Sequence, residues 1–224
     1  MNKVSYDPVK QLKPVAIVAR WGNVLAVHKD SPINSFKEFV DYAKANPGKI
    51  DYSSAGIGGA NHLAGIAVAT HQNLDMLNIV FGSSPASLSA LMAKSVHAHF
   101  GNSSDMIAPV QGGLVKALAV TSPNRMPQLP NVPTMAELLP GFEFTSWAAL
   151  VASADTPKEI VDQAANALER IANEPEVAKR LHTLGVDAVA IKADAAQAII
   201  QKDLPFFAKL VDAAGLRHKD NTGR

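Results

Sequence analysis

Three short stretches of glycine, serine and asparagine hold the residue types best suited to binding a negatively charged group. They are Ser53–Ala60, Gly82–Ser84 and Gly101–Ser104, and each follows an apolar, strand-like segment and precedes a helix-like one. Backbone N–H groups at the start of a helix attract anions, and glycine lets a ligand approach the backbone closely. The three stretches therefore predict an anion-binding site. The alternative, that they are only turns between strands and helices, stays open at this point.

Such a site would suit a carboxylate or a phosphate. Hydrogen bonds to a charged group contribute roughly 1.5–3 kcal/mol each, so three or four backbone donors can hold an anion without an arginine. All three loops are expected at the carboxyl ends of their strands, where open α/β sheets bind ligands. We therefore expect the loops to converge on one ligand.

Nucleotide and hydrolase motifs fit these stretches less well. Gly56, Gly58 and Gly59 follow a predicted strand, but Asn61 stands where the dinucleotide fingerprint needs a small residue, and Asp75 precedes the next strand instead of closing it. The sequence contains neither a Gly-Lys-Ser/Thr phosphate loop nor a Gly-x-Ser-x-Gly elbow. No catalytic residue is predicted. An enzyme that uses the same anion pocket on a phosphorylated substrate or nucleotide remains the alternative from another class.

The histidines and tryptophans are each open to two interpretations. His97 and His99 share one face of a predicted strand, as metal ligands can, but no further ligands have matching spacing, so we expect hydrogen-bonded histidines and no metal. His62 either hydrogen-bonds back to the glycine loop or covers the end of its helix. Trp21 and Trp147 either line a cleft or pack beside their strands, and packing is favoured.

Composition narrows the class of protein. The chain has 224 residues, 47% of them hydrophobic and 18% charged, and no cysteine, which is typical of a globular protein. Its 21 basic and 20 acidic residues nearly cancel, which argues against nucleic acid as a partner. No apolar run approaches the roughly 20 residues of a membrane span, and Met1–Lys13 lacks the pattern of a signal peptide. The protein is expected either to be cytosolic or to have a sequence that begins downstream of its natural start.

Strands and helices are expected to alternate through the first half of the chain. Ser35 and Glu38 predict a capping box, and Ser84 followed by Pro85 predicts another helix start. This alternation predicts an α/β fold with a mainly parallel sheet covered on both faces. The expected strands are Pro14–Ala19, Asn23–Val27, Ile50–Ser53, Met76–Phe81, Val96–Phe100 and Lys116–Thr121.

The second half is expected to be different. Proline-rich Ser122–Gly141 predicts a surface connection with one short helix opened by Thr134, and Phe142–Ser153 reads as extended. Everything beyond is predicted to be helical, apart from a frayed tail at His218–Arg224. Three helices are expected. The first begins at Thr156 and Pro157, and the second covers Pro175–Gly185. The third starts at Asp194, with Gln197 as its capping partner and a kink at Pro205.

One longer motif is far more specific than any single loop. Tyr52–Gly65, which reads YSSAGIGGANHLAG, resembles the signature of the substrate-binding proteins of tripartite tricarboxylate transporters, also called the Bug family. Further landmarks of that family follow in the right order over essentially the whole chain. They are Tyr6-Asp7-Pro8 with Pro14-Val15-Ala16, Lys116–Ser122, Leu129–Thr134, Pro140–Glu143 leading to Ser146-Trp147, and Thr156–Glu159.

The resemblance implies a fold and a function. The fold would be a two-domain, type II periplasmic-binding-protein-like α/β fold, and the protein would not be an enzyme. It would capture a small organic acid (a di- or tricarboxylate or an aromatic carboxylate) in an interdomain cleft, largely through backbone amides, and deliver it to membrane permease subunits. No cofactor is implied. The ligand-binding residues would be Ser54, Ala55, Gly56, Gly58, Gly59 and Ala60, assisted by Ser84 and Asn102.

The resemblance also implies domain limits and a location. Residues 1–22 and 146–224 would form a partial first domain, lacking the family's N-terminal segment, and residues 23–145 a second domain. A periplasmic location rests on the resemblance alone. The family's common aspartates are replaced by His97 and Gly101, so a specific acid is not implied. A further alternative is a non-binding fragment that self-associates through open sheet edges and exposed apolar surface.

Overall fold

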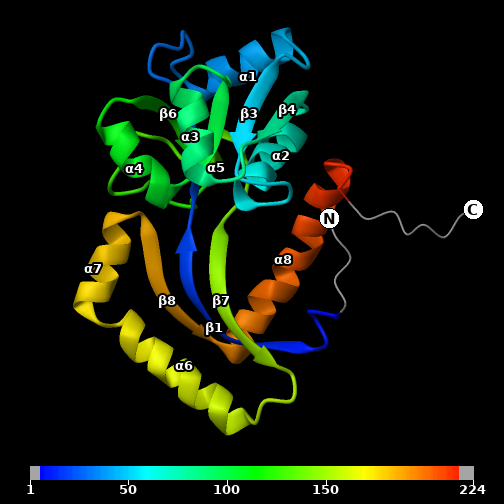
Figure 1. Ribbon diagram of the computed structural model, residues 1–224, viewed down its shortest axis with the longest axis vertical. Coiled ribbons are helices and arrows are strands. Elements are labelled where there is room, and N and C mark those ends of the chain that lie inside the picture. The colour runs from blue at the N-terminus through cyan, green and yellow to red at the C-terminus, as the bar shows by residue number, and fades with distance from the viewer. Residues whose placement is uncertain (1–5, 217–224) are drawn as a thin grey trace, which may run out of the picture. The chain divides into compact units, whose positions relative to one another are not determined.

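The computed structural model describes residues 6–216, so the tail expected at His218–Arg224 lies outside the described residues. These residues form two compact units (Figure 1). Unit 1 comprises residues 6–20, 147–178 and 188–216, and unit 2 comprises residues 21–146 and 179–187. The sequence had grouped 179–187 with the C-terminal helices, whereas the structure joins that stretch to unit 2.

A five-stranded sheet of order β4-β3-β5-β2-β6 forms the centre of unit 2. Strand β3 runs parallel to β4 and β5, whereas β2 runs antiparallel to β5 and β6. Four strands therefore share one direction, which confirms the mainly parallel sheet, and only the reversal of β2 was not expected. The carboxyl ends of β3, β4 and β5 meet the start of β2 at one edge. The strands are β2 Asn23–His28, β3 Ile50–Ser54, β4 Met76–Val80, β5 Ala98–Asn102 and β6 Val115–Val120.

Four helices connect these strands and a fifth follows the last of them, and three of the five begin at a side-chain cap. Ser35 caps α1 as expected, but the carboxylate of Glu38 accepts from Asn34 N, so the reciprocal half of the capping box is absent. Ser83, rather than Ser84, caps α3, because its hydroxyl accepts from Ala86 N at 3.3 Å. The helices are α1 Phe36–Ala45, α2 Ala60–Gln72, α3 Ser84–Met92, α4 Ser103–Gln111 and α5 Met135–Leu138, the last opened by the expected capping box of Thr134 and Glu137.

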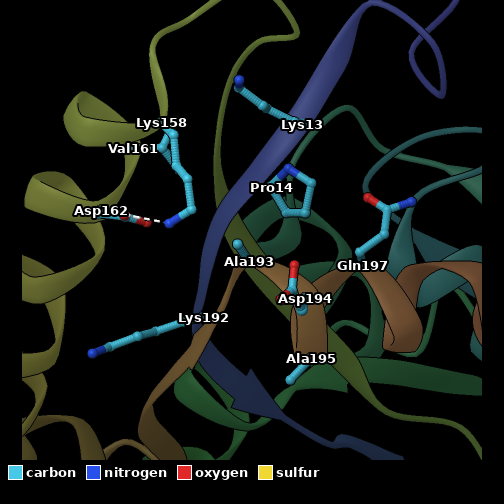
Figure 2. Close-up of a pocket in the computed structure, with 10 residues that line it drawn as sticks. All are labelled: Lys13, Pro14, Lys158, Val161, Asp162, Lys192, Ala193, Asp194, Ala195 and Gln197. Carbon is cyan, nitrogen blue, oxygen red and sulfur yellow. Dashed lines mark hydrogen bonds and ion pairs between the residues drawn. The ribbon is translucent and has the colours of Figure 1, made fainter.

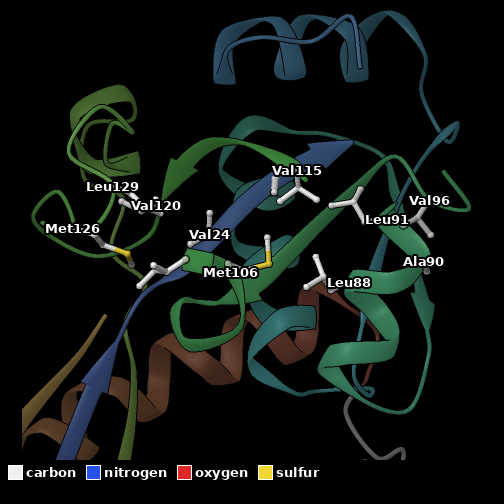
Figure 3. Packing of buried hydrophobic residues seen from close by; sticks show 12 residues of the cluster. Val24, Leu88, Ala90, Leu91, Val96, Met106, Val115, Val120, Met126 and Leu129 are labelled. Carbon is white, nitrogen blue, oxygen red and sulfur yellow. The ribbon is translucent and has the colours of Figure 1, made fainter. Parts of the chain in front are cut away.

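Helices α2 and α3 cover opposite faces of this sheet. Tyr52 donates its hydroxyl hydrogen to His62 O in α2 at 3.2 Å, while its neighbour Ser53 donates to Ser87 O in α3 at 3.0 Å. Successive side chains of a strand point to opposite faces, so the two helices lie on opposite sides. On the α3 side a buried cluster that includes Val24, Leu91 and Met106 forms the core (Figure 3).

The remaining elements centre on a three-stranded sheet of order β7-β1-β8 (Figure 1). Strand β8 corrects the expectation that everything after Ser153 is helical. Helix α8 starts at Ala193 with Lys192 at the N-cap and no side-chain cap, so the expected start at Asp194 with Gln197 is wrong, and the helix continues through Pro205. The elements are β1 Leu12–Trp21, β7 Ser146–Ser153, β8 Val186–Lys192, α6 Lys158–Ala172, α7 Pro175–Thr183 and α8 Ala193–Ala213. Within residues 6–216, no helix combines the length and the apolar character that a bilayer span requires.

Candidate functional site

The edge where β3 and β5 end is the candidate ligand site of unit 2. These two strands are neighbours, and the connections that follow β3 and β4 pass over opposite faces of the sheet. Such a switch point leaves a crevice at the carboxyl ends of the strands, where α/β proteins bind ligands. The glycine loop after β3 and Asn102 at the end of β5 both lie at this edge.

Ser54 and the loop after it offer hydrogen-bond donors that the protein itself leaves unused. Ser54 is fully buried, and its hydroxyl has no hydrogen-bond partner among the described residues. The backbone N–H groups of Ala55, Gly56 and Ile57 likewise donate to no acceptor within residues 6–216. A Cβ added at Gly56 would meet nothing within 4 Å, so one side of the loop is open. A buried polar group without a partner is costly, which makes this cluster a candidate binding site.

His62 holds the glycine loop in shape. Its Nδ1 accepts a hydrogen bond from Gly58 N at 3.0 Å, as the sequence suggested. Burial lowers the pKa of His62, so the ring is neutral at pH 7 and keeps the lone pair that this bond needs. Gly58 has φ +76°, which favours glycine, and Gly59 N donates to Gly56 O at 3.3 Å. The amides of Gly58 and Gly59 thus shape the loop, while those before them stay available.

Helix α2 begins directly after this loop without a side-chain cap. Gly59 is its N-cap, and no side-chain hydrogen bond satisfies the first turn, so the N–H groups of Ala60 and Asn61 lack intrahelical acceptors. The side chain of Asn61 instead donates to Phe100 O at 2.7 Å. This bond ties the start of α2 to the end of β5 and holds the two donor-bearing segments together.

Asn102 lies at the same edge, held by two neighbours. Its Oδ1 accepts from Trp21 Nε1 at 3.4 Å and from Asn23 Nδ2 at 3.2 Å. The indole of Trp21 therefore makes a polar contact beyond the packing that the sequence favoured. Asn23 is fully buried and also donates to Phe100 O at 3.1 Å. Asn102 thus lies beside donors of the same edge, and its role in ligand binding stays a prediction.

Ser84 is engaged differently from the other candidate residues. Its hydroxyl donates to the carboxylate of Asp105 at 2.6 Å. This hydrogen is therefore directed at a group of the protein and not at an anionic ligand. Asp105 adds negative charge beside α3 and α4, which was not weighed from the sequence.

The histidines on β5 and just before it serve the packing of the sheet. His99 is fully buried, and its Nδ1 lies 3.1 Å from Ser53 O, so this nitrogen carries the hydrogen. Burial lowers the pKa of His99 and keeps the ring neutral. His97 instead pairs with Asp51, its Nδ1 lying 2.6 Å from the Asp51 carboxylate. In the part of the chain that the structure describes, no three such side chains come close enough to hold a metal ion.

A hollow of about 560 Å³ lies in unit 1, and none of the candidate residues predicted from the sequence is among the residues that line it (Figure 2). Its three lysines already have partners: Lys13 donates to Thr156 O, Lys158 pairs with Asp162, and Lys192 pairs with Glu169. Lys158 and Lys192 are neutralised by carboxylates, whereas the backbone carbonyl that accepts from Lys13 leaves its charge in place, so the hollow offers an anion little net positive charge. We therefore place the candidate site at the β3–β5 edge, whose donors are unused, and not in this hollow.

Sequence reasoning missed two residues of this edge. Asn23 and Asn61 are both buried, and both donate to Phe100 O. The available signal was their position, since each is a polar residue at the start of an otherwise apolar strand or helix. Their partner is a backbone carbonyl distant in sequence, so the contact itself could not be read from spacing.

Comparisons with known proteins bear on the family of this chain and not on the location of its site. The model of the family described as "Tripartite tricarboxylate transporter family receptor" matches residues 1–216. A curated relative, the UPF0065 protein in the tcbD-tcbE intergenic region of Pseudomonas sp. (strain P51), is 35% identical over 187 residues, which is 82% of this chain and 55% of the relative. Protein BugT of Bordetella pertussis is 25% identical and is covered to 68%. The chain thus spans little more than half the length of the first of these relatives.

Solved structures match the fold over almost the whole chain. The periplasmic binding protein BugD is 31% identical with a TM-score of 0.84, over 96% of this chain and 73% of that protein. Rpa4515 of R. palustris, solved with adipate, is 26% identical with a TM-score of 0.86, over 96% and 72%. MatC of Rhodopseudomonas palustris, solved with malate, is 25% identical with a TM-score of 0.84, over 94% and 73%.

The fold is therefore the type II periplasmic-binding-protein fold, as the sequence motif implied. The matching family consists of solute-binding proteins and not of enzymes. With a family model that covers residues 1–216, the chain belongs to the tripartite tricarboxylate transporter receptor family.

Proposed function

We propose that this chain reversibly captures a small organic carboxylate in the periplasm and delivers it to the membrane permease subunits of a tripartite tricarboxylate-type transporter. The binding site belongs to the domain of residues 23–145. Capture is non-covalent and uses no cofactor or metal. The proposed ligand-binding residues are Ser54, Ala55, Gly56, Ile57 and Ala60, in the loop that Gly58 and Gly59 shape, with Ser84 and Asn102 at the rim.

One observation carries this proposal: a buried hydroxyl and a run of backbone amides at the β3–β5 edge have no partners within residues 6–216. All of these groups can donate, and an ionised carboxylate only accepts. Three such bonds at roughly 1.5–3 kcal/mol each are on the scale of the ~8 kcal/mol that a micromolar Kd requires. The adipate and malate named for two similar structures are ligands of this chemical class.

Calorimetric titration tests the proposal directly. The panel holds adipate, malate, citrate and benzoate, and we expect heat of binding from at least one acid. The matched variant is Gly56→Ala, whose methyl group would meet no protein atom within 4 Å but would occupy the open side of the loop. We expect Gly56→Ala to fold normally and to bind the same acid at least ~10-fold more weakly, since the added methyl lengthens one or more charge-assisted bonds. A folded wild-type chain that binds none of the panel would refute capture by this chain.

Light scattering at several concentrations accompanies the titration. A constant monomer mass is expected for a solute-binding protein that works as one chain. A mass that rises with concentration, together with no binding, would favour the self-associating fragment instead.

A further inference from the structure

Asn102 occupies a helix N-cap but does not cap its helix. An asparagine at this position normally accepts a hydrogen bond from the first turn, and losing that bond costs roughly 1 kcal/mol. In α4 no such bond forms, because Oδ1 of Asn102 is already used by Trp21 and Asn23. A local rule that is broken in this way often marks a functional position.

The two neighbours determine which way the amide of Asn102 faces. An indole N–H can only donate, so the atom 3.4 Å from Trp21 Nε1 must be the oxygen of Asn102. Asn23 gives the same answer independently: its Nδ2 lies 3.1 Å from Phe100 O, a carbonyl that can only accept, and 3.2 Å from Asn102. Two donors thus hold the amide oxygen of Asn102.

Asn23 is itself fixed from the other side. Its Oδ1 accepts from the hydroxyl of Ser146 at 3.3 Å, and its backbone N–H donates to Thr121 Oγ1 at 2.8 Å. Asn23 is fully buried, so water does not compete for these bonds. The orientation of the Asn102 amide is therefore set by a buried network and does not follow the ligand.

The consequence concerns the nitrogen of Asn102. With Oδ1 held, Nδ2 points away from Trp21 and Asn23, and it donates to no group within residues 6–216. We infer that Trp21 and Asn23 are positioning residues that lock Asn102 so that its N–H₂ group faces the ligand, which makes the site select an ionised carboxylate over the corresponding carboxamide. This inference rests on the proposed function, and it adds the reason for ligand selectivity.

The lock is tested first without any ligand, by the indole N–H resonances of the two tryptophans. Trp21→Phe assigns the peaks, and Trp147, whose indole donates to Asp203 at 2.9 Å, serves as the internal control. We expect Asn102→Ala to move the Trp21 peak and Asn102→Asp to preserve its hydrogen bond, because a carboxylate also accepts; neither should move the Trp147 peak. A Trp21 peak that does not move in Asn102→Ala would overturn the lock.

Selectivity is tested next with adipate and its diamide, adipamide. Asn102→Asp exchanges only the outward N–H₂ for a negatively charged oxygen, so adipate affinity should fall about 100-fold while adipamide affinity changes only a few-fold. Asn124→Asp makes the same change of charge on an exposed loop and should alter neither affinity. Equal losses for both ligands in Asn102→Asp would overturn the inference while leaving the proposed function standing. If wild-type protein bound no acid of the panel, the proposed function and this selectivity would both be refuted, although the indole shifts would still report on the lock itself.

Discussion

Replacing Gly65 by alanine sets two physical effects against each other. Alanine favours a helix interior over glycine by about 1 kcal/mol, so helix propensity alone predicts a more stable protein. The structure predicts the opposite, because a Cβ at Gly65 would lie 2.3 Å from Cε2 and 2.9 Å from the hydroxyl of buried Tyr52. An ordinary contact is 3.4 Å or more. Helix α2 and the Tyr52 ring must therefore separate by about 1 Å, in a core where overpacking costs roughly 1–3 kcal/mol.

The ring has little room to retreat. Phe100 packs against Tyr52 edge-on at 5.4 Å between ring centroids, and the Tyr52 hydroxyl donates to His62 O, a bond worth about 1 kcal/mol. The loss of this bond adds to the cost of overpacking, and the gain in helix propensity offsets about 1 kcal/mol of the sum. We therefore expect Gly65→Ala to lower the free energy of unfolding by about 1–3 kcal/mol. Because α2 carries the start of the candidate site, adipate binding should weaken as well.

Urea unfolding followed by far-ultraviolet circular dichroism measures this change. Gly56→Ala is the control, since its added methyl has no neighbour within 4 Å, and its stability should stay within about 0.5 kcal/mol of wild type. Adding Tyr52→Leu to Gly65→Ala should recover part of the loss, which a double-mutant cycle detects as coupling between the two sites. A Gly65→Ala protein as stable as wild type, or more stable, would refute the packing argument.

Three further predictions concern acid stability, the glycine loop and Ser84. Burial lowers the pKa of His62 and His99, so near pH 6.5 the unfolded chain binds protons that the folded chain excludes. The free energy of unfolding should therefore be greatest above that pH and fall as the pH decreases below it, by at most about 1.4 kcal/mol per pH unit for His99. Urea midpoints that stay unchanged between pH 7.5 and 5.5 would contradict this. Gly58→Ala should lower the free energy of unfolding by about 1–2 kcal/mol in the same assay because of its φ of +76°, and an unchanged midpoint would mean that the loop adapts. Ser84→Ala removes a hydroxyl that donates to Asp105, so titration should give a smaller loss of adipate affinity than Gly56→Ala, and a larger loss would place Ser84 in direct contact with the ligand.

Local sequence signals were enough to predict the elements that build the candidate site. Strand β3, the glycine loop and α2 follow one another as expected, because glycine punctuation and helical periodicity act over a few residues. The bond between His62 and the loop, which spans four residues, was one of the two interpretations that the sequence left open for His62. Ser83 and Ser84 were confused because either serine can cap the same helix, and only the final geometry decides between them.

Features that depend on distant contacts were missed. Strand β8, Val186–Lys192, pairs with β1, which lies near the other end of the sequence. Its apolar segment is short and stands between two helical patterns, so the sequence pattern indicated helices for the whole stretch. The reversed direction of β2 depends on its pairing with β5 and β6, which lie far along the sequence, and periodicity does not report strand direction. The orientation of Asn102 depends on two groups about eighty residues away, at separations of 81 and 79 positions. Such contacts follow from the fold and not from local preference.

An amide NMR titration tests the central claim most directly, because it observes the proposed donors one by one. When adipate or malate is added to the ¹⁵N-labelled chain, the amide protons of Ala55, Gly56 and Ile57 should move downfield in proportion to occupancy. The amide of Gly58, which already donates to His62, should move much less. If calorimetry detects binding while the amides of Ala55, Gly56 and Ile57 stay unperturbed, the acid is held elsewhere and the account of this site is wrong.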